Sequence, residues 1–202
     1  QARFVMTLEY PIEYVFLGKK AFIVQREVGR HVPSLSQGVL TALRSNVSVL
    51  VLGEVRGPED VEAMLLAAET GHLVLASLHA VSATDAIERI ALALPPGKRE
   101  LAYQVLSSVL LGVLVQRLVP LKGERRMVLA YELLLAIPEV KALLKEGKLA
   151  EVEALLEEGG RPGLVSLERS LADLVTSGRV AFETARAYAN RDGRFTALLR
   201  KG

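Results

Sequence analysis

The sequence predicts an α/β fold, a mostly parallel sheet with helices on both faces, followed by a small all-α region. Short apolar runs rich in β-branched residues alternate with helical patterns over the first two thirds of the chain, as expected for strands joined by crossover helices. After Ala136 only amphipathic helical patterns follow. We therefore expect one domain over residues 1–136 and a small helical domain over residues 137–202.

Apolar segments bounded by glycine or proline are the candidate strands. Pro11 ends the first, because proline cannot donate to the ladder. The run closed by Gly53 is apolar except at Ser48 and rich in β-branched residues, which suits a strand covered on both faces. The last candidate follows a charged turn, and no strand is expected after it. The predicted strands are Phe4–Leu8, Ala21–Gln25, Val47–Leu52, Leu73–Leu78 and Met127–Leu135.

The helices are predicted from apolar spacing together with start and stop residues. Ser34 or Ser36 can cap the first, Pro58 can start the second, and Gly71 can stop it. The segment from about Lys98 to Leu118 is apolar almost all round, which indicates a long buried helix. The other predicted helices run to about Arg44 and over Glu59–Thr70, Ser82–Leu94, Pro138–Glu146, Lys148–Glu158, Ser166–Ser177 and Phe182–Tyr188, with a last short one in the tail Asn190–Gly202.

Composition excludes several classes of protein. The chain has 202 residues, half of them hydrophobic, which is enough for a substantial core and argues against disorder. A net charge of +2 from 25 basic and 23 acidic residues gives no strong attraction to nucleic acid. The absence of cysteine removes disulfides, cysteine zinc sites and thiol nucleophiles, and fits a reducing compartment.

Two features bear on membranes and on the length of the parent protein. The longest apolar tract, Leu101–Leu121, is interrupted by polar residues, so a core helix explains it better than a transmembrane segment. No signal peptide opens the chain. The first residue is Gln1 rather than methionine, so we expect the later part of a longer protein.

Glu54 and His79 follow two consecutive predicted strands and are the first candidates for a site. In open α/β sheets, ligands bind beyond the carboxyl ends of the strands. A carboxylate there can hold the hydration shell of a magnesium ion or polarise a water beside a γ-phosphate. The pattern alone is weak, because many α/β strands end in an acidic residue.

Further polar residues are weaker candidates. Glu9 and Glu13 flank the Pro11 turn, where their carboxylates can face a ligand or simply be solvated. His72 and His79 are an odd number of residues apart, which argues against a shared metal site and favours separate hydrogen-bonding roles. Of these two, His79 is the better candidate for contacting a phosphate or a neighbouring subunit. Arg26, Arg30 and His31 lie in a loop-like stretch that could reach a neighbour.

Several motifs together resemble one family. The chain contains, in order, TLEYPIEY, QREVGR, VLVLGEVRGPED and ETGHLVLASLHA. These resemble the acidic box, arginine segment, Walker B motif and histidine box of the secretion ATPases that power type IV pili and type II secretion. The similarity continues through ATDAIERI and VLVQRLVP into the tail, where AIPEVKALLKEGK and GLVSLERSLADLVTSGRV most resemble the PilT-like retraction ATPases.

The resemblance implies a RecA-like ATPase domain in a homo-hexameric ring, with ATP between subunits and Mg2+ on its phosphates. Glu54 would activate water, while Glu9 and Glu13 would support the magnesium ion or the water. Glu54 and Glu9 would hold Mg2+ through water molecules. The family also implies a cytoplasmic location at the inner membrane, where a pilus platform protein is the partner.

The resemblance also assigns the basic residues. His79, with His72, matches positions expected to sense phosphate or link neighbouring subunits. Arg26, Arg30 and Arg44 fall in the segment that supplies arginine contacts across subunits, and one or two of them are expected to act as arginine fingers. Arg56, within the Walker B segment, joins this phosphate-sensing or intersubunit group.

This chain departs from the family pattern at several places. Tyr10 stands where an aspartate usually follows the first glutamate, Gly57 stands in place of the common aspartate after Arg56, and SNVS precedes the Walker B strand. The phosphate-loop pattern GxxxxGK[ST] does not occur in the 202 residues. Without its amides and lysine, we expect these residues alone to bind ATP poorly and to hydrolyse it negligibly. We expect the loop upstream of Gln1.

Three functions remain open at this stage. The first is part of a motor ATPase that drives pilus retraction, with a pilus assembly or type II secretion ATPase as the alternative. The second is a ring subunit that binds nucleotide without turning it over, as Tyr10 suggests. The third is an interaction module whose helical tail docks onto a membrane platform protein. The absence of cysteine favours the retraction branch, because its relatives in assembly and type II secretion usually carry a four-cysteine zinc insertion.

Overall fold

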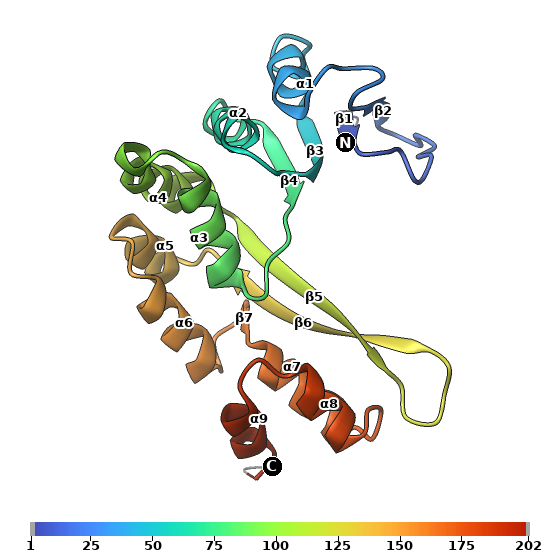
Figure 1. Cartoon of the computed structure of the whole chain (residues 1–202), viewed down its shortest axis with the longest axis vertical. Coiled ribbons are helices and arrows are strands. Elements are labelled where there is room, and N and C mark those ends of the chain that lie inside the picture. Colours follow the sequence, from blue (N-terminus) through green and yellow to red (C-terminus); the bar gives the residue numbers. More distant parts are fainter. Residues whose placement is uncertain (1–2, 201–202) are drawn as a thin grey trace. The chain divides into compact units, whose positions relative to one another are not determined.

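A computed structural model describes residues 3–200, and its contacts divide the chain into two units (Figure 1). The first comprises the residues up to His79 together with Arg89–Val109. The second comprises Ala80–Glu88 and the residues from Leu110 onward. The boundary expected near Ala136 falls inside the second unit, so the division into domains at that residue stays a prediction.

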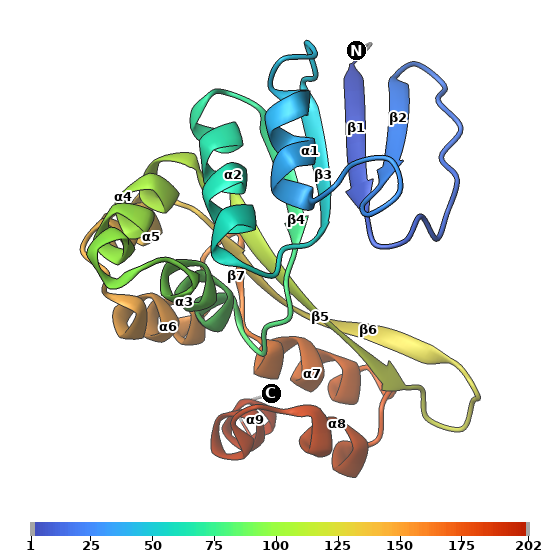
Figure 2. The same cartoon turned by 45° about the horizontal axis from the view of Figure 1, so that its top comes forward.

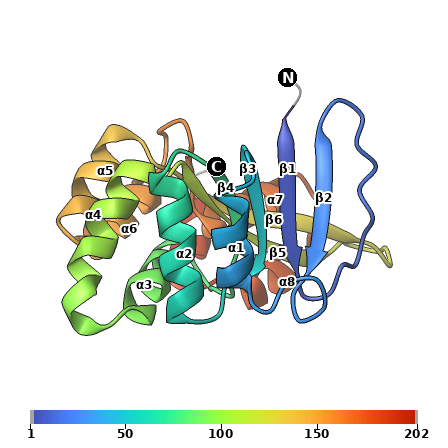
Figure 3. The same ribbon diagram turned by 90° about the horizontal axis from the view of Figure 1, so that it is seen from above.

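The first unit is built on a four-stranded parallel sheet, in the order β2-β1-β3-β4 (Figure 3). Leu8 of β1 lies opposite Leu52 of β3, which in turn lies opposite Ala76 of β4. Because the strands are parallel and in register, their carboxyl ends lie at one edge. The strands are β1 (Phe4–Glu9), β2 (Phe22–Glu27), β3 (Val49–Glu54) and β4 (Leu73–Ser77), close to the predicted segments.

Two crossover helices, α1 (Leu35–Ala42) and α2 (Pro58–Glu69), pack side by side on one face of this sheet (Figure 2). Ser34 caps α1, since its side chain accepts a hydrogen bond from the Gln37 amide, and Pro58 occupies the first turn of α2. The expectation that the third strand is covered on both faces is wrong for the described residues. Its leucines are buried but its valines only partly so, because α1 and α2 cover a single face.

The prediction of one long helix from about Lys98 to Leu118 is wrong for the second half of this segment. Helix α4 (Arg99–Val109) packs against α2 and stops, and strand β5 (Gly112–Pro120) follows. Val115 and Val119 are buried while Leu114 and Leu118 are exposed, so the segment alternates as a strand does. Because the exposed face also carries leucines, the sequence has no polar residues at those two positions to reveal the strand alternation, and the segment looks like a helix that is apolar all round. Within residues 3–200, no helix combines the length and the apolarity needed to cross a bilayer.

The helices α3 (Ala83–Ala93) and η1 (Pro96–Lys98) connect β4 to α4 along the chain. The second unit then centres on a three-stranded antiparallel sheet, in the order β5-β6-β7. β7 corrects the expectation that no strand follows residue 135: its two residues pair with Leu133 and Leu134. The remaining elements are β6 (Met127–Leu135), β7 (Leu164–Val165), α5 (Pro138–Lys145), α6 (Leu149–Glu158), α7 (Leu167–Thr176), α8 (Phe182–Tyr188) and α9 (Asp192–Leu199).

The hydrophobic core of the second unit joins the β5–β6 hairpin to the C-terminal helices. Val119 and Val128 of the hairpin are buried in one cluster with Leu171 of α7 and Phe195 of α9. The Phe195 ring stacks on that of Phe182, with the centroids 5.7 Å apart. The tail therefore completes the core of the hairpin.

Gly163, which precedes β7, permits a close approach that a side chain would block. Its φ is +84°, and a Cβ there would lie 2.5 Å from Leu135 Cδ1. Gly160 has a φ of +77° with nothing within 4 Å, so it has the same backbone constraint without the clash.

We expect Gly163→Ala to destabilise the chain more than Gly160→Ala. Both variants place alanine in a left-handed conformation at a cost of about 1–2 kcal/mol, and overpacking against Leu135 adds roughly 1–3 kcal/mol to the first. Urea unfolding followed by circular dichroism measures both. Equal destabilisation by the two variants would show that Leu135 moves aside freely.

Candidate functional site

The candidate site lies at the carboxyl edge of the parallel sheet, where β3 and β4 end together. Glu54 is the last residue of β3, and Ser77 is the last of β4. The Val55 amide donates a 3.1 Å hydrogen bond to the Ser77 carbonyl, and Ser77 Oγ donates a 2.7 Å bond to the Gly53 carbonyl. These two bonds fix the strand ends beside each other just before His79.

The Glu54 carboxylate lies between an imidazole and a guanidinium. His79 Nε2 is 3.3 Å from Oε1 of Glu54, and Arg56 Nη2 is 2.6 Å from Oε2. The side chains are 32% (Glu54), 58% (Arg56) and 87% (His79) exposed, so a ligand can reach all of them. The structure thus brings together the two residues that the order of the strands places at one edge.

The charge on Glu54 is stabilised mainly by Arg56. The hydrogen bond from the Arg56 guanidinium is the largest influence and lowers the pKa of Glu54; burial opposes it, and the charges of Arg56 and His79 add to the lowering. The same pairing raises the pKa of Arg56. Glu54 is therefore a carboxylate at neutral pH, able to orient a water or a hydrated cation.

Tyr10 and Asp60 position Arg56, a contact that no sequence pattern indicates. The guanidinium carbon lies 5.0 Å from the centroid of the Tyr10 ring, within the range of a cation–π contact. The Arg56 amide also donates to the Asp60 carboxylate at 3.4 Å, while the Ser36 amide donates to that carboxylate at 3.2 Å. From the sequence alone, Tyr10 counts only as a missing aspartate.

The acidic-box residues differ in how firmly they are held. Glu9 ends β1 and accepts hydrogen bonds from Thr7 Oγ1 and from Gln25 Nε2. A Cβ on Gly53 would lie 3.4 Å from the Glu9 Cα, so the end of β1 lies close to the residue that precedes Glu54. Glu13 is exposed in the loop between β1 and β2. Glu9 is thus held beside the site, whereas Glu13 is an exposed residue of the loop.

Two candidates lie at the opposite edge of the sheet. His72 precedes β4, with its Nδ1 3.2 Å from both Thr70 Oγ1 and the Ala67 carbonyl at the end of α2. Arg44 follows α1 and is exposed. Crossover helices return the chain to the amino edge of a parallel sheet, so neither residue joins Glu54.

The other two arginine candidates are nearer. Arg26 lies in β2 opposite Leu8, one residue before the strand ends, and Arg30 is exposed in the turn that follows. Both therefore belong to the carboxyl edge, on the far side of β1 from β3.

The donor set limits how a metal ion could be held. Among residues 3–200 there is no group of three or more imidazole and carboxylate side chains arranged to bind a metal ion directly. Mg2+ commonly keeps several waters and is bound through one or two carboxylates plus substrate phosphates. Glu54 and Glu9 each end a strand at the carboxyl edge, and together they supply the one or two carboxylates that such a hydrated ion needs.

A parallel sheet with crossover helices, carrying a carboxylate, an imidazole and a guanidinium at its carboxyl edge, defines an α/β protein with its candidate site where such sheets hold ligands. Comparison with known families is more specific. The chain belongs to the type II/IV secretion system protein family, whose model matches residues 1–156.

The relatives include pilus motor proteins. The chain is 36% identical over 189 residues to a twitching motility protein of Neisseria gonorrhoeae, covering 94% of this chain and 50% of that protein. It is 35% identical over 185 residues to the type IV pilus retraction ATPase PilT of Pseudomonas aeruginosa, covering 92% and 54%. A crystal structure of the pilus retraction motor PilT with bound ADP superimposes with a TM-score of 0.88 at 37% identity, covering 96% and 54%. The chain thus spans about half the length of the curated relatives that it matches.

We expect Arg56→Ala to raise the pKa of Glu54 toward the ordinary glutamate value, because the dominant stabilising hydrogen bond is lost. The wild-type carboxylate should therefore stay ionised to lower pH than the variant. A ¹³C NMR titration of the side-chain carboxyl measures both midpoints. Glu146, whose pKa is lowered by Lys148, is the internal control and should not move. An unchanged Glu54 midpoint would contradict the assigned cause.

Proposed function

We propose that the chain is the C-terminal part of a hexameric motor ATPase that couples ATP hydrolysis to retraction of a type IV pilus in twitching motility. The observation that carries the proposal is the Glu54 carboxylate held between Arg56 and His79 at the end of β3. The similarity to PilT, which extends over 92% of the chain and so includes most of the helical tail, supports the retraction branch.

The proposed chemistry is positioning and charge compensation, as phosphoryl transfer requires. Glu54, ionised at neutral pH, would accept a hydrogen bond from the attacking water and orient it toward the γ-phosphate. His79, largely exposed beside it, would donate a hydrogen bond to a phosphate oxygen and so sense its presence. Arg56 is long and exposed enough to transfer from Glu54 to a phosphate, which would free the carboxylate to act on water.

ATP is the proposed substrate, and Mg2+ would accompany its phosphates. Glu54 and Glu9 would hold the ion through water molecules, with Glu13 at the outer side. The ion would supply neutralisation of phosphate charge. The phosphate-loop pattern does not occur in these residues, so the β- and γ-phosphates would need amides and a lysine from a preceding segment of the parent protein.

The basic residues divide by the edge on which they lie. Arg26 and Arg30, at the carboxyl edge, are the candidates for arginine fingers close to the sheet ends that carry Glu54. Arg44 and His72, at the amino edge, could act only on the site of a neighbouring subunit. We propose a homo-hexamer in the parent protein, cytoplasmic and peripheral at the inner membrane, where a pilus platform protein would be the partner.

One observation favours a second candidate, a ring subunit with impaired catalysis. Tyr10 stands where the family usually has an aspartate, and its ring holds the Arg56 guanidinium that pairs with Glu54. If Arg56 does not leave Glu54, the carboxylate cannot orient water. Turnover by the parent protein separates this candidate from the motor. A pilus assembly ATPase or a type II secretion ATPase is the alternative to a retraction ATPase.

We expect Glu54→Gln in the parent protein to lower kcat for ATP hydrolysis by about 10²- to 10⁴-fold, because an amide is a far weaker acceptor for the attacking water. Nucleotide binding should persist, since Glu54 acts on water rather than on the phosphates. Phosphate release and nucleotide titration measure the two quantities. The matched control is Glu62→Gln on α2, which removes the exposed ion pair between Glu62 and Lys98 of η1. Unchanged turnover in the Glu54 variant would remove the residue from this role.

We expect the 202 residues alone to release no phosphate from ATP above background. The site supplies a carboxylate and an imidazole but no amide cradle for the phosphates within the sequence. A malachite-green assay with purified chain and magnesium tests this. Robust turnover would show that another part of the chain binds the phosphates.

A further inference from the structure

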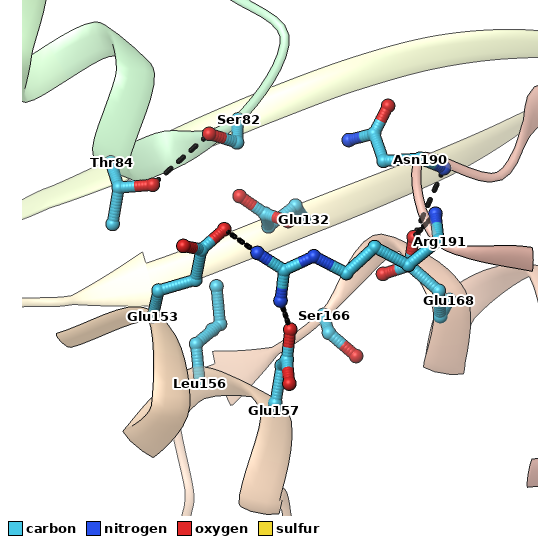
Figure 4. Close-up of a pocket in the computed structure, with 10 residues that line it drawn as sticks. All are labelled: Ser82, Thr84, Glu132, Glu153, Leu156, Glu157, Ser166, Glu168, Asn190 and Arg191. Atoms are coloured by element: carbon cyan, nitrogen blue, oxygen red, sulfur yellow. Dashed lines mark hydrogen bonds and ion pairs between the residues drawn. The ribbon is translucent and has the colours of Figure 1, made fainter. Parts of the chain in front are cut away.

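Two buried glutamates of the second unit hold the starts of helices (Figure 4). Glu132 of β6 is 5% exposed and accepts a 2.6 Å hydrogen bond from the Ala83 amide at the start of α3, and another from the Leu167 amide at the start of α7. The first amides of a helix have no partner within the helix, so a carboxylate is a favourable acceptor for them. Burial nevertheless raises the pKa of Glu132. Glu132 thus fixes the start of α3 to β6.

Glu168 of α7 holds the start of α9 in the same way. It is 4% exposed and accepts hydrogen bonds of 3.0 Å from the amides of Asn190 and Arg191. The Arg191 guanidinium pairs with Glu153 and Glu157 of α6. The segment before α9 is therefore tied to α6 and α7 around a cavity of about 30 Å³, large enough for roughly one water.

Arg117 and Asn190 connect this segment to the chain that follows β4. Arg117 of β5 donates to the Tyr188 carbonyl at 3.0 Å, to Asn190 Oδ1 at 2.7 Å and to the Val81 carbonyl at 3.4 Å. Asn190 Nδ2 donates to the same Val81 carbonyl at 3.1 Å. The Val81 amide is also held, by the Asp85 carboxylate at 2.8 Å. Val81 is thus fixed on both its amide and its carbonyl.

Val81 is two residues after His79, and Ala80 alone separates them. Two residues of chain span at most about 7 Å, so an anchored Val81 restricts the backbone of His79. On the other side, Ser77 is fixed to Gly53 by its side chain. The candidate phosphate sensor is therefore the middle of a short segment held at both ends, first by β3 and then by the second unit.

We propose that Arg117 and Asn190 are positioning residues for His79: by holding the Val81 carbonyl they link the C-terminal helices to the imidazole that contacts Glu54. A displacement of the segment before α9 would then change the placement of His79 at the nucleotide site. The proposal rests on the proposed function, because it gives the C-terminal helices control over that site.

The first test uses the 202-residue chain and needs no activity. Asn190→Ala removes two hydrogen bonds at an exposed position, the donor to the Val81 carbonyl and the acceptor of Arg117, and should leave the fold intact. Arg117→Ala removes three hydrogen bonds. Arg117→Lys keeps a donor and should rescue part of the Arg117→Ala effect. Arg126→Ala, which breaks the exposed Arg126–Glu124 ion pair in the turn between β5 and β6, is the control.

In Asn190→Ala and Arg117→Ala we expect amide hydrogen exchange at residues 80–84 to rise roughly tenfold, the effect of losing about one hydrogen bond. We also expect the NMR signals of the His79 ring and of the Glu54 carboxyl to shift, and neither change in Arg126→Ala. A merely structural role would accelerate exchange at residues 80–84 and leave the His79 and Glu54 signals in place. That result overturns the proposal.

The second test measures ATP hydrolysis by the parent protein. Misplacement of His79 should lower kcat about 10- to 100-fold in Asn190→Ala, with KM for ATP nearly unchanged, while Arg126→Ala keeps wild-type rates. Equal rates in wild type and Asn190→Ala overturn the proposal. Absence of hydrolysis in the wild type would refute the proposed function instead, and the hydrogen exchange and NMR measurements would still decide the positioning role.

Discussion

The parallel, in-register pairing of β1, β3 and β4 is the constraint on which the candidate site depends. Leu8, Leu52 and Ala76 lie level with one another, so the residues that follow them emerge together at one edge. The register between β3 and β4 then shifts at Gly53, and such an irregularity re-aims the next side chain. Gly53 is suited to this place because a Cβ there would lie 3.0 Å from the Leu8 carbonyl. The backbone geometry of the strand ends thus sets the direction in which the Glu54 side chain leaves the sheet.

Side-chain contacts then set the charge of the site. Glu54 has a guanidinium on one oxygen and an imidazole near the other, which keeps it ionised while solvent still reaches it. The Tyr10 ring lies within cation–π distance of Arg56 and stands where the family motif usually has an aspartate, so this edge carries one carboxylate fewer than the motif implies.

Sequence patterns were sufficient where local rules decide the structure. The four parallel strands, α1, α2 and the C-terminal helices end within a few residues of their predicted limits, because glycine, proline and serine mark those limits. The β5 segment was misassigned because its exposed leucines hide a strand alternation that only pairing with β6 stabilises. Glu54 and His79 could be predicted from strand ends, whereas the contact between Arg56 and Tyr10 depends on two loops meeting in three dimensions. No local signal indicates such a contact.

The contacts of Val81 with Arg117 and Asn190, and of Ala83 with Glu132, likewise have no signal in the sequence, since these partners are 36 to 109 residues apart. A serine or aspartate next to a helix can cap its first turn, but only a side chain from another element can tie that turn to a second one. Glu132 does this from β6 for α3 and α7 together, and the raised pKa shows that its burial outweighs the two amide donors. A neutral core residue in place of Glu132 would avoid the free-energy cost of burying a carboxylate. It would also leave the start of α3 without its bond to β6. The hydrogen bonds of Glu132 thus connect the chain after His79 to the sheet and the C-terminal helices of the second unit.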